Sequence, residues 1–331
     1  MGLGIPPEWG GSGGDSRSVA AVLEEVSRAS AAVATLLSVQ LSVVEAPLLQ
    51  WGTDAQRAEF LRPLAEGRLL GAFALTEPGA GSDAAAIRTH YARENGGFRL
   101  TGSKTFITNA ASADVVLLFA RGEVPPERIS AFLLPKGTPG FRPGNPFDKL
   151  GLKGSETVEL TLDGVRLPVE NLLGPEGAGL RVALGALTGG RVGIAACALG
   201  VAQAGYDRLR VACELDPTDA NRIRLARSYV DVLSARALVE GAAERKDRGE
   251  PFVEEASAAK LAASRAALEV TARAVDAEAE TGGSRASEAM RLWRDARVFP
   301  IVEGTSEIQE LLLGRTLAGK TARSGSATDS P

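Results

Sequence analysis

The spacing of apolar residues changes twice along this chain, and this change constrains the fold more than any other feature of the sequence. From Ser16 to Gly67, apolar residues recur at intervals of three and four positions, as at Val19, Val22, Leu23 and Val26. This spacing is typical of amphipathic helices, and breaks near Ala46-Pro47 and residues 51–54 indicate that there are several of them.

The middle of the chain has a different pattern. Between Gly71 and Pro168, short runs rich in β-branched and aromatic residues alternate with Gly, Pro and Asp; the runs are residues 98–101, 114–120, 129–134 and 157–162. Such runs predict a small antiparallel barrel or sandwich. After Gly177, long Ala/Leu/Arg-rich segments return at about 178–213, 220–249, 252–279 and 303–318, which is enough for a helix bundle.

We therefore expect an α+β protein in three parts with a tail. The parts are an N-terminal helical domain (residues 1–70), a middle antiparallel β-domain (71–170) and a C-terminal helix bundle (171–320). Residues 321–331 are rich in Ser, Gly and Thr and cannot bury an apolar face, so a disordered tail is expected there.

Composition excludes several classes of function. His90 is the only histidine, which argues against histidine-based triads and metal sites. Cys197 and Cys213 lack metal-ligand spacing, so we expect buried thiols rather than a disulfide, and no metal. A net charge of −4 without a basic patch argues against nucleic acid as a partner. No apolar run approaches the length needed to cross a bilayer, and the N-terminus lacks a basic signal region, so we expect a cytoplasmic protein without a membrane partner.

Two segments far apart in the chain suggest chemistry. Residues 73–83, FALTEPGAGSD, form a strand-like run that breaks at Pro78 into a Gly-rich turn, whose backbone N–H groups suit a phosphate or a polar planar ligand. Residues 302–309, VEGTSEIQ, offer the carboxylate of Glu303 just before a helix. Each is weak evidence alone, because Gly-rich turns and helix-capping glutamates are common.

The two segments occur together with four further blocks, and in this order the sequence resembles the acyl-CoA dehydrogenase family of flavoproteins. The blocks are GSKTFITN (102–109), DKLGLKGS (148–155), GGRVGIA (189–195) and WRDAR (293–297). The resemblance covers most of the chain and implies the same three-part architecture. It also implies FAD as cofactor and oxidoreductase activity on the α–β bond of an acyl thioester.

This reaction needs a base and an electron acceptor, because a proton leaves the α carbon while a hydride leaves the β carbon. No side chain accepts a hydride, whereas a flavin does. The resemblance implies that Phe73, Leu75 and Thr76 bind the isoalloxazine and that Phe106 and Thr108 flank the ring and its N5. Taken alone, Phe73 and Phe106 read as ordinary core aromatics. Thr305 and Glu307 are assigned to the cofactor region by the same resemblance.

Glu303 aligns with the catalytic glutamate of the family, although Val302 replaces the usual tyrosine before it. A carboxylate facing an acyl chain and a flavin is desolvated, so we expect a pKa of about 6 to 7 for this base. The resemblance assigns carbonyl polarisation to a flavin ribityl hydroxyl and the backbone N–H of the base. Gly304 permits close approach of substrate and backbone, or is simply a helix-start glycine.

Two residues match the part of the family site that binds coenzyme A. Ser82 fits a hydrogen bond to the pantetheine arm, and Arg191 matches a position close to the substrate channel and its phosphates. With equal weight, Arg191 reads as a surface arginine with a partly buried stem. Thr188 stands where the family often has an aspartate, which puts the adenine-side contact in doubt.

Three departures concern the N-terminus and the ADP half of the flavin site. Residues 1–11 match an internal family segment, so either the start is misassigned or part of the N-terminal layer is absent. After Arg210, a shortened connection lacks the family's Arg-x-x-Phe-Gly stretch. Ala279-Glu280 replace a Gly-Gly pair and are preceded by Asp276 and Glu278, whose carboxylates would repel a diphosphate.

These observations leave two functions open. The first is an FAD-dependent dehydrogenase of an acyl-CoA or an acyl-carrier protein, with an electron-transfer flavoprotein as oxidant. The second is a non-redox or inactive member that binds an acyl thioester with weak or no FAD. Nitrogen monooxygenation on the same fold is disfavoured, because the base is retained.

Substrate and assembly are less constrained. Residues 29–50 resemble the helices lining the acyl pocket. They contain no Lys or Arg, and Glu45 is their sole charged residue, so a neutral short or branched acyl group is preferred. The resemblance implies a homodimer or homotetramer. An apolar face formed by Ile308, Leu311, Leu312 and Leu313 suits either subunit contact or the monomer core.

Overall fold

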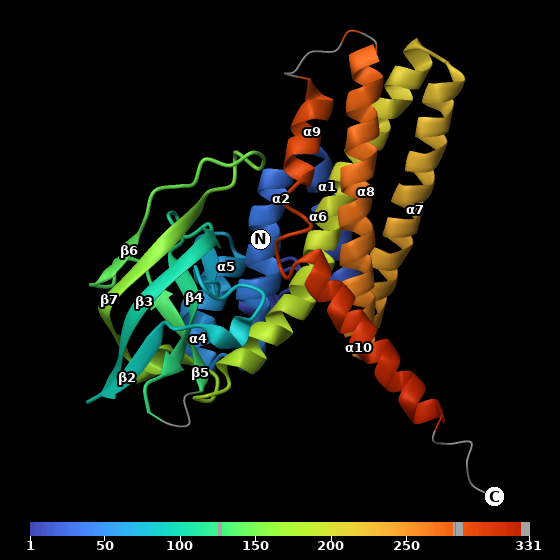
Figure 1. Ribbon diagram of the computed structural model, residues 1–331. Coiled ribbons are helices and arrows are strands. Elements are labelled where there is room, and N and C mark those ends of the chain that lie inside the picture. The colour runs from blue at the N-terminus through green and yellow to red at the C-terminus, as the bar shows by residue number, and fades with distance from the viewer. Residues whose placement is uncertain (125–127, 281, 283–286, 326–331) are drawn as a thin grey trace, which may run out of the picture.

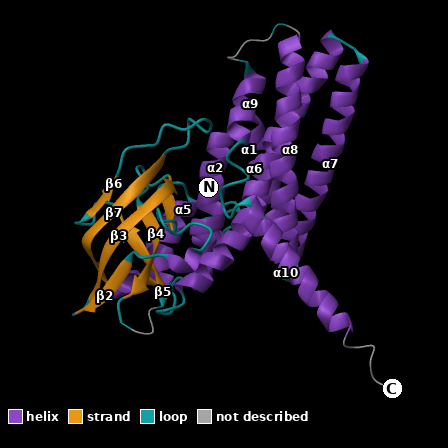
Figure 2. Cartoon of the chain, in the orientation of Figure 1, coloured by secondary structure: helices purple, strands orange, loops and turns teal. Residues whose placement is uncertain are grey.

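The computed structural model describes residues 1–124, 128–280, 282 and 287–325, with only the backbone for residues 319–325. A β-sheet lies to one side of a bundle of long helices, and a layer of short helices lies between them (Figure 1). The cartoon in Figure 2 shows that strands and long helices are separated in space as they are in sequence.

The N-terminal layer is a chain of short helices. These are η1 (Pro7–Trp9), α1 (Ser16–Ala29), α2 (Ala31–Ser38), η2 (Val39–Glu45), α3 (Ala46–Trp51), α4 (Asp54–Gln56), η3 (Arg57–Leu61) and α5 (Arg62–Ala65). Asp15 starts α1 because its side chain accepts a hydrogen bond of 2.7 Å from the backbone N–H of Ser18. Thr53 and Gln56 cap α4 reciprocally in a capping box.

The middle of the chain forms one eight-stranded sheet. Its strands are β1 (Gly71–Ala74), β2 (His90–Glu94), β3 (Gly97–Thr108), β4 (Val115–Gly122), β5 (Ile129–Pro135), β6 (Phe141–Pro143), β7 (Thr157–Pro168) and β8 (Leu172–Leu173). The order is β6-β7-β3-β2-β4-β5-β8, with β1 also paired to β4. Most pairings are antiparallel as expected, but β1 and β2 each run parallel to β4. Both parallel pairs join strands that are not adjacent in sequence, so the local run pattern could not reveal them.

The C-terminal bundle is built from α6 (Gly179–Leu215), α7 (Asp219–Asp247), α8 (Val253–Glu280), α9 (Glu288–Ala296) and α10 (Ser306–Gly325). Residues 190–202 of α6 are all buried, and small side chains there let neighbouring helices approach closely. A Cβ atom on Gly200 would lie 2.2 Å from the backbone oxygen of Glu24, so α1 crosses α6 at a point that only glycine accommodates.

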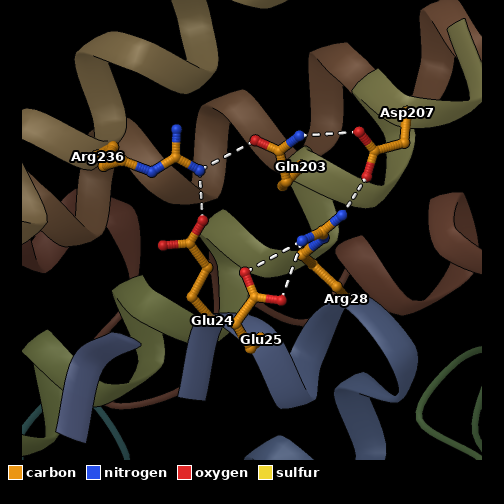
Figure 3. Close-up of polar contacts among 6 residues, drawn as sticks. All are labelled: Glu24, Glu25, Arg28, Gln203, Asp207 and Arg236. Carbon is orange, nitrogen blue, oxygen red and sulfur yellow. Dashed lines mark hydrogen bonds and ion pairs between the residues drawn. The ribbon is translucent and has the colours of Figure 1, made fainter. Parts of the chain in front are cut away.

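Ion pairs and hydrogen bonds join α1, α6 and α7 across their polar edge (Figure 3). Arg28 of α1 binds Asp207 of α6 at 2.8 Å, and Gln203 of α6 donates to the same carboxylate at 3.0 Å. Gln203 also accepts a bond of 3.0 Å from Arg236 of α7, which pairs with Glu24 as well. This network fixes the relative positions of three helices that otherwise contact through small apolar residues.

Two helical segments are long and apolar enough to cross a membrane, contrary to the expectation that no such run exists. They are Ala31–Trp51, which spans several of the short helices, and Gly179–Leu215, which is α6. Within their most apolar windows, 67% and 72% of the residues are buried inside the protein. Their apolar character is therefore explained by the core that they form.

The chain ends in a helix that leaves the body of the protein. α10 begins beside α8 and points away from both sheet and bundle (Figure 1). It runs to Gly325, into the segment expected to form the tail, whereas residues 326–331 lie outside the described residues.

Candidate active site

Glu303 lies in the turn between α9 and α10, in a backbone conformation unusual for its type. Its φ is +54°, and that of the following Gly304 is +93°. A left-handed conformation costs a non-glycine residue about 1–2 kcal/mol, so it persists only where surrounding contacts hold it. Here it directs the carboxylate away from α10 and towards α6.

The carboxylate of Glu303 lies against the backbone of α6. Its Oε2 is 1.8 Å from the point that a Cβ atom would occupy on Gly190, so glycine is required for this approach. Oε2 is buried and has no hydrogen-bond partner among the described residues. The site thus contains an acid with one buried oxygen that the described residues do not engage.

Two cations surround this acid. Arg191, next to Gly190 on α6, is 6% exposed, and its Nε is also buried without a partner in the described part of the chain. Lys260 on α8 is wholly buried, and its Nζ donates to the backbone oxygen of Gly304 at 2.6 Å. Arg191 therefore faces the acid from inside the protein and is not a surface arginine.

Burial determines the protonation of Glu303. Desolvation raises its pKa to about 8, and the charges of Arg191 and Lys260 oppose this rise only in part. This is higher than the value of about 6 to 7 expected from sequence, because the buried Oε2 lacks a hydrogen-bond donor among the described residues.

The segment from Phe73 to Thr76 lies beside the GSKTFITN block of β3. The backbone N–H of Thr105 donates to the Thr76 oxygen at 2.9 Å, and Lys104 Nζ donates to the Leu75 oxygen at 3.0 Å. Phe73 is half-buried, with its ring centroid 5.0 Å from that of Phe119. The structure thus places Leu75 and Thr76 beside the block that contains Phe106 and Thr108, whereas Phe73 contacts β4. Their assignment to the isoalloxazine stays a prediction.

A buried ion pair holds these two blocks together. Lys104 Nζ lies 2.7 Å from Glu77 Oε1, and both side chains are almost fully buried. Burial acts to raise the pKa of Glu77, but the hydrogen bond from Lys104 and the backbone N–H groups of Arg88 and Thr89 outweigh it and lower the pKa. Sequence reasoning missed this pair, although both residues stood inside the motifs.

Phe106 and Thr108 lie further along β3. Phe106 has a φ of +58° and is 66% exposed, and its ring centroid lies 5.4 Å from that of Phe147. It is therefore not a core aromatic. Thr108 is half-buried in register with Thr157 of β7.

The other predicted site residues are less enclosed. Ser82 is exposed on the turn after β1, and Glu307 is exposed at the start of α10. Thr305 caps α10, since its Oγ1 accepts a weak bond of 3.4 Å from the Ile308 N–H. Ser82 follows β1 whereas Arg191 lies in α6, and their assignment to one coenzyme A site stays a prediction.

The WRDAR and DKLGLKGS blocks contact each other. Asp295 of α9 accepts a hydrogen bond of 2.6 Å from the backbone N–H of Leu152, which has a φ of +50°. A Cβ atom on Gly151 would lie 2.4 Å from the Arg294 oxygen. This contact links the sheet to the bundle close to the turn that carries Glu303.

The carboxylates near the end of α8 are paired within the chain. Glu278 binds Arg208 of α6 at 2.7 Å, and Glu280 binds Arg224 of α7 through two bonds of 2.6 Å. Two of the three carboxylates expected to repel a diphosphate, Glu278 and Glu280, are thus neutralised by arginines.

Comparisons with known proteins agree with this geometry. The N-terminal, middle and C-terminal domain families of acyl-CoA dehydrogenase match residues 1–68, 72–165 and 177–318. The chain is 43% identical to an acyl-CoA dehydrogenase of Bacillus subtilis, over 97% of this chain and 87% of that protein.

Solved structures are similar over the same range. Butyryl-CoA dehydrogenase from Megasphaera elsdenii has a TM-score of 0.92 and 39% identity, covering 96% of this chain and 86% of that one. A glutaryl-CoA dehydrogenase from Mycobacterium smegmatis in complex with FADH2 has a TM-score of 0.91 and 29% identity, covering 96% and 83%. On the strength of these matches and of the site itself, the chain belongs to the acyl-CoA dehydrogenase family.

Proposed function

We propose that the protein is an FAD-dependent oxidoreductase that dehydrogenates the α–β bond of an acyl thioester, with Glu303 as the base. The α C–H proton would pass to the Glu303 carboxylate, and the β C–H would leave as a hydride, giving an α,β-unsaturated thioester. When bound, the flavin supplies the hydride acceptor at N5. The observation that carries the proposal is the unpartnered, buried Oε2 of Glu303 beside Gly190.

The electrostatics of Glu303 suit a base that must later release its proton. A raised pKa makes the carboxylate a stronger proton acceptor, while Arg191 and Lys260 keep the ionised form accessible. The backbone N–H of Glu303 is proposed as one donor to the thioester oxygen, with a flavin hydroxyl as the other. Gly304 leaves room for this approach.

The residues of the sheet fit the ring half of the flavin. Phe106, exposed and held at a positive φ, offers an aromatic face to a planar ring, and Thr108 would lie near N5. Phe73, Leu75 and Thr76 would contribute backbone and hydroxyl bonds. We assign Thr305 and Glu307 to the same cofactor region, and Ser82 and Arg191 to the substrate.

The ADP half of the site supports a second, weaker candidate. Glu278 and Glu280 lie where the resemblance expects a neutral glycine surface for the diphosphate, and their arginine partners are already engaged. This favours weak FAD binding, and in the extreme a non-redox protein that binds an acyl thioester.

For the substrate, we propose a neutral, short acyl group on coenzyme A or a carrier protein. Glu45 is the sole charged residue of residues 29–50, and it is buried in a hydrogen bond of 2.9 Å from Gln40. Its Oε1 is therefore engaged within the fold. An electron-transfer flavoprotein is the proposed oxidant, and the cytoplasm the proposed location.

The surface supports a homodimer or homotetramer. On α7, Ile223, Val230 and Leu233 share one face by their spacing and are each at least half exposed. On α10, Leu311 and Leu317 are exposed, whereas Ile308, Leu312 and Leu313 are partly buried. Sedimentation at micromolar concentration tests this proposal, and a monomer would contradict it.

The function is tested by measuring how fast butyryl-CoA reduces the flavin bound to the Glu303→Gln variant. The variant should keep the fold and the flavin content of the wild type, but its rate of flavin reduction by butyryl-CoA should fall by a factor of about 10² to 10⁴. Bleaching of the flavin at the wild-type rate would refute the role of Glu303. Absence of flavin absorbance under saturating FAD would favour the non-redox candidate.

A further inference from the structure

Lys260 is a buried cation that donates hydrogen bonds to two backbone oxygens. It lies on α8, is 0% exposed, and donates to the oxygens of Gly304 at 2.6 Å and Pro300 at 3.3 Å. Burying an ammonium group is costly, so its contacts to this turn require an explanation.

The turn that Lys260 binds is the one that sets the direction of Glu303. A second side chain donates to the same turn: Gln309 of α10, also 0% exposed, donates through Nε2 to the Gly304 oxygen at 3.1 Å and to the Glu303 oxygen at 3.4 Å. Two buried donors from different helices therefore converge on the carbonyl that follows the left-handed Glu303.

We propose that Lys260 is a positioning residue for the reaction: with Gln309, it holds the Gly304 carbonyl so that Glu303 keeps its left-handed conformation and its carboxylate stays against Gly190. This inference rests on the proposed role of Glu303 as base. Without these donors, the turn relaxes towards the favoured right-handed backbone, and the carboxylate moves off the line of the α proton. A shift of about 1 Å is enough to slow such a step by a factor of about 10².

Lys260 has a second effect, through its charge. The charged groups that face it are Glu303 in the turn, Arg191 on α6 and Glu307 at the start of α10. The ammonium favours the ionised form of Glu303, so its removal raises the pKa of this acid further. The positioning effect of Lys260 and the effect of its charge can be separated by substitutions that remove the hydrogen-bond donor, the charge or both.

The test uses three variants of the FAD-loaded, full-length enzyme with butyryl-CoA. Lys260→Met removes donor and charge, Lys260→Gln keeps a donor without charge, and Gln309→Ala removes the second donor and no charge. We expect Lys260→Met to lower kcat by about 10- to 100-fold with KM within about threefold, and to move the acid limb of kcat/KM to higher pH.

Lys260→Gln should have a higher kcat than Lys260→Met but should keep the same shift of the acid limb to higher pH, because it also lacks the charge. Gln309→Ala should lower kcat without shifting the pH profile. Lys149→Met is the matched control, because Lys149 also donates to a backbone oxygen, that of Ser155 in the loop between β6 and β7. It should leave the pH profile unchanged.

Wild-type kcat and pH profile in folded, flavin-containing Lys260→Met would overturn the proposal. If Lys260→Met does not fold, a wild-type kcat in both Lys260→Gln and Gln309→Ala would overturn the proposal instead. The parent assignment fails separately: if Glu303→Gln stays active, the base is misassigned, whereas an inactive Glu303→Gln with a normal Lys260→Met removes only the positioning role.

Discussion

The Oε2 atom of Glu303 lies 1.8 Å from the position that a Cβ atom would take on Gly190. Two segments more than a hundred residues apart thus share one small volume, and the acid can occupy it only because residue 190 has no side chain. This relationship makes Gly190 a direct probe of the site.

Gly190→Ala should displace the carboxylate and lower kcat by about 10²-fold or more, because the added methyl takes the place of the acid. Anaerobic flavin reduction by butyryl-CoA measures this effect. Gly189→Ala is the matched control, since its Cβ meets only Lys246 Nζ at an ordinary 3.6 Å. Equal rates in the two variants would show that the acid does not need this position.

Glu77 and Lys104 should be strongly coupled in stability. Glu77→Gln leaves the fully buried Lys104 ammonium without its carboxylate, and breaking such a pair costs about 3–5 kcal/mol. The double variant Glu77→Gln/Lys104→Met should cost less than the sum of the single ones. Urea unfolding measures the three changes, and simple additivity would argue against the pair.

The stability of the ligand-free protein should depend on pH through Glu303. Its folded pKa, about 8, lies above its ordinary value of 4.5, so the folded state binds a proton that the unfolded state releases. The stabilisation of the folded state that comes with this proton is complete below pH 4.5 and is lost as pH rises towards 8. Glu303→Gln lacks this loss, so its advantage in free energy of unfolding should grow over this range, to at most about 5 kcal/mol, and level off above pH 8. A difference that stays constant from pH 5 to pH 8 would contradict the raised pKa.

FAD should bind substoichiometrically in the purified protein, and Glu278→Gly/Glu280→Gly should tighten it. The repulsion of about 2 to 3 kcal/mol per carboxylate expected from sequence is reduced by the ion pairs, but the substitutions also free Arg208 and Arg224 to meet a diphosphate. Fluorescence titration with FAD measures the gain. Glu240→Gly on the exposed face of α7 is the control, and stoichiometric, dialysis-resistant FAD in the wild type would reject the prediction.

The sequence was sufficient for the fold family, and it singled out Glu303 as the candidate acid. Hydrophobic periodicity separates helices from strands because each follows from local backbone geometry, and the spacing of apolar residues in α6, α7 and α8 gave helices close to their observed bounds. The motif blocks predict Glu303 as the base, because they occur in the order of the family. Parallel pairing of β1 and β2 with β4 was out of reach, since it joins strands distant in sequence.

Tertiary structure alone decided how the acid is held. Gly190 and Gln309 stand inside the motif blocks and Lys260 stands outside them, but the sequence does not show that any of the three contacts the turn of Glu303. A lysine, a glutamine and a glycine in helices usually serve solubility, capping or close packing. Their relationship to Glu303 arises when α6, α8 and α10 pack around the turn and exclude water. The same exclusion raises the pKa of the acid, turns Arg191 from a candidate surface residue into a buried neighbour, and pairs Glu278 and Glu280 with arginines from other helices. The residue types are local properties of the chain, whereas desolvation and charge pairing depend on which segments meet in space.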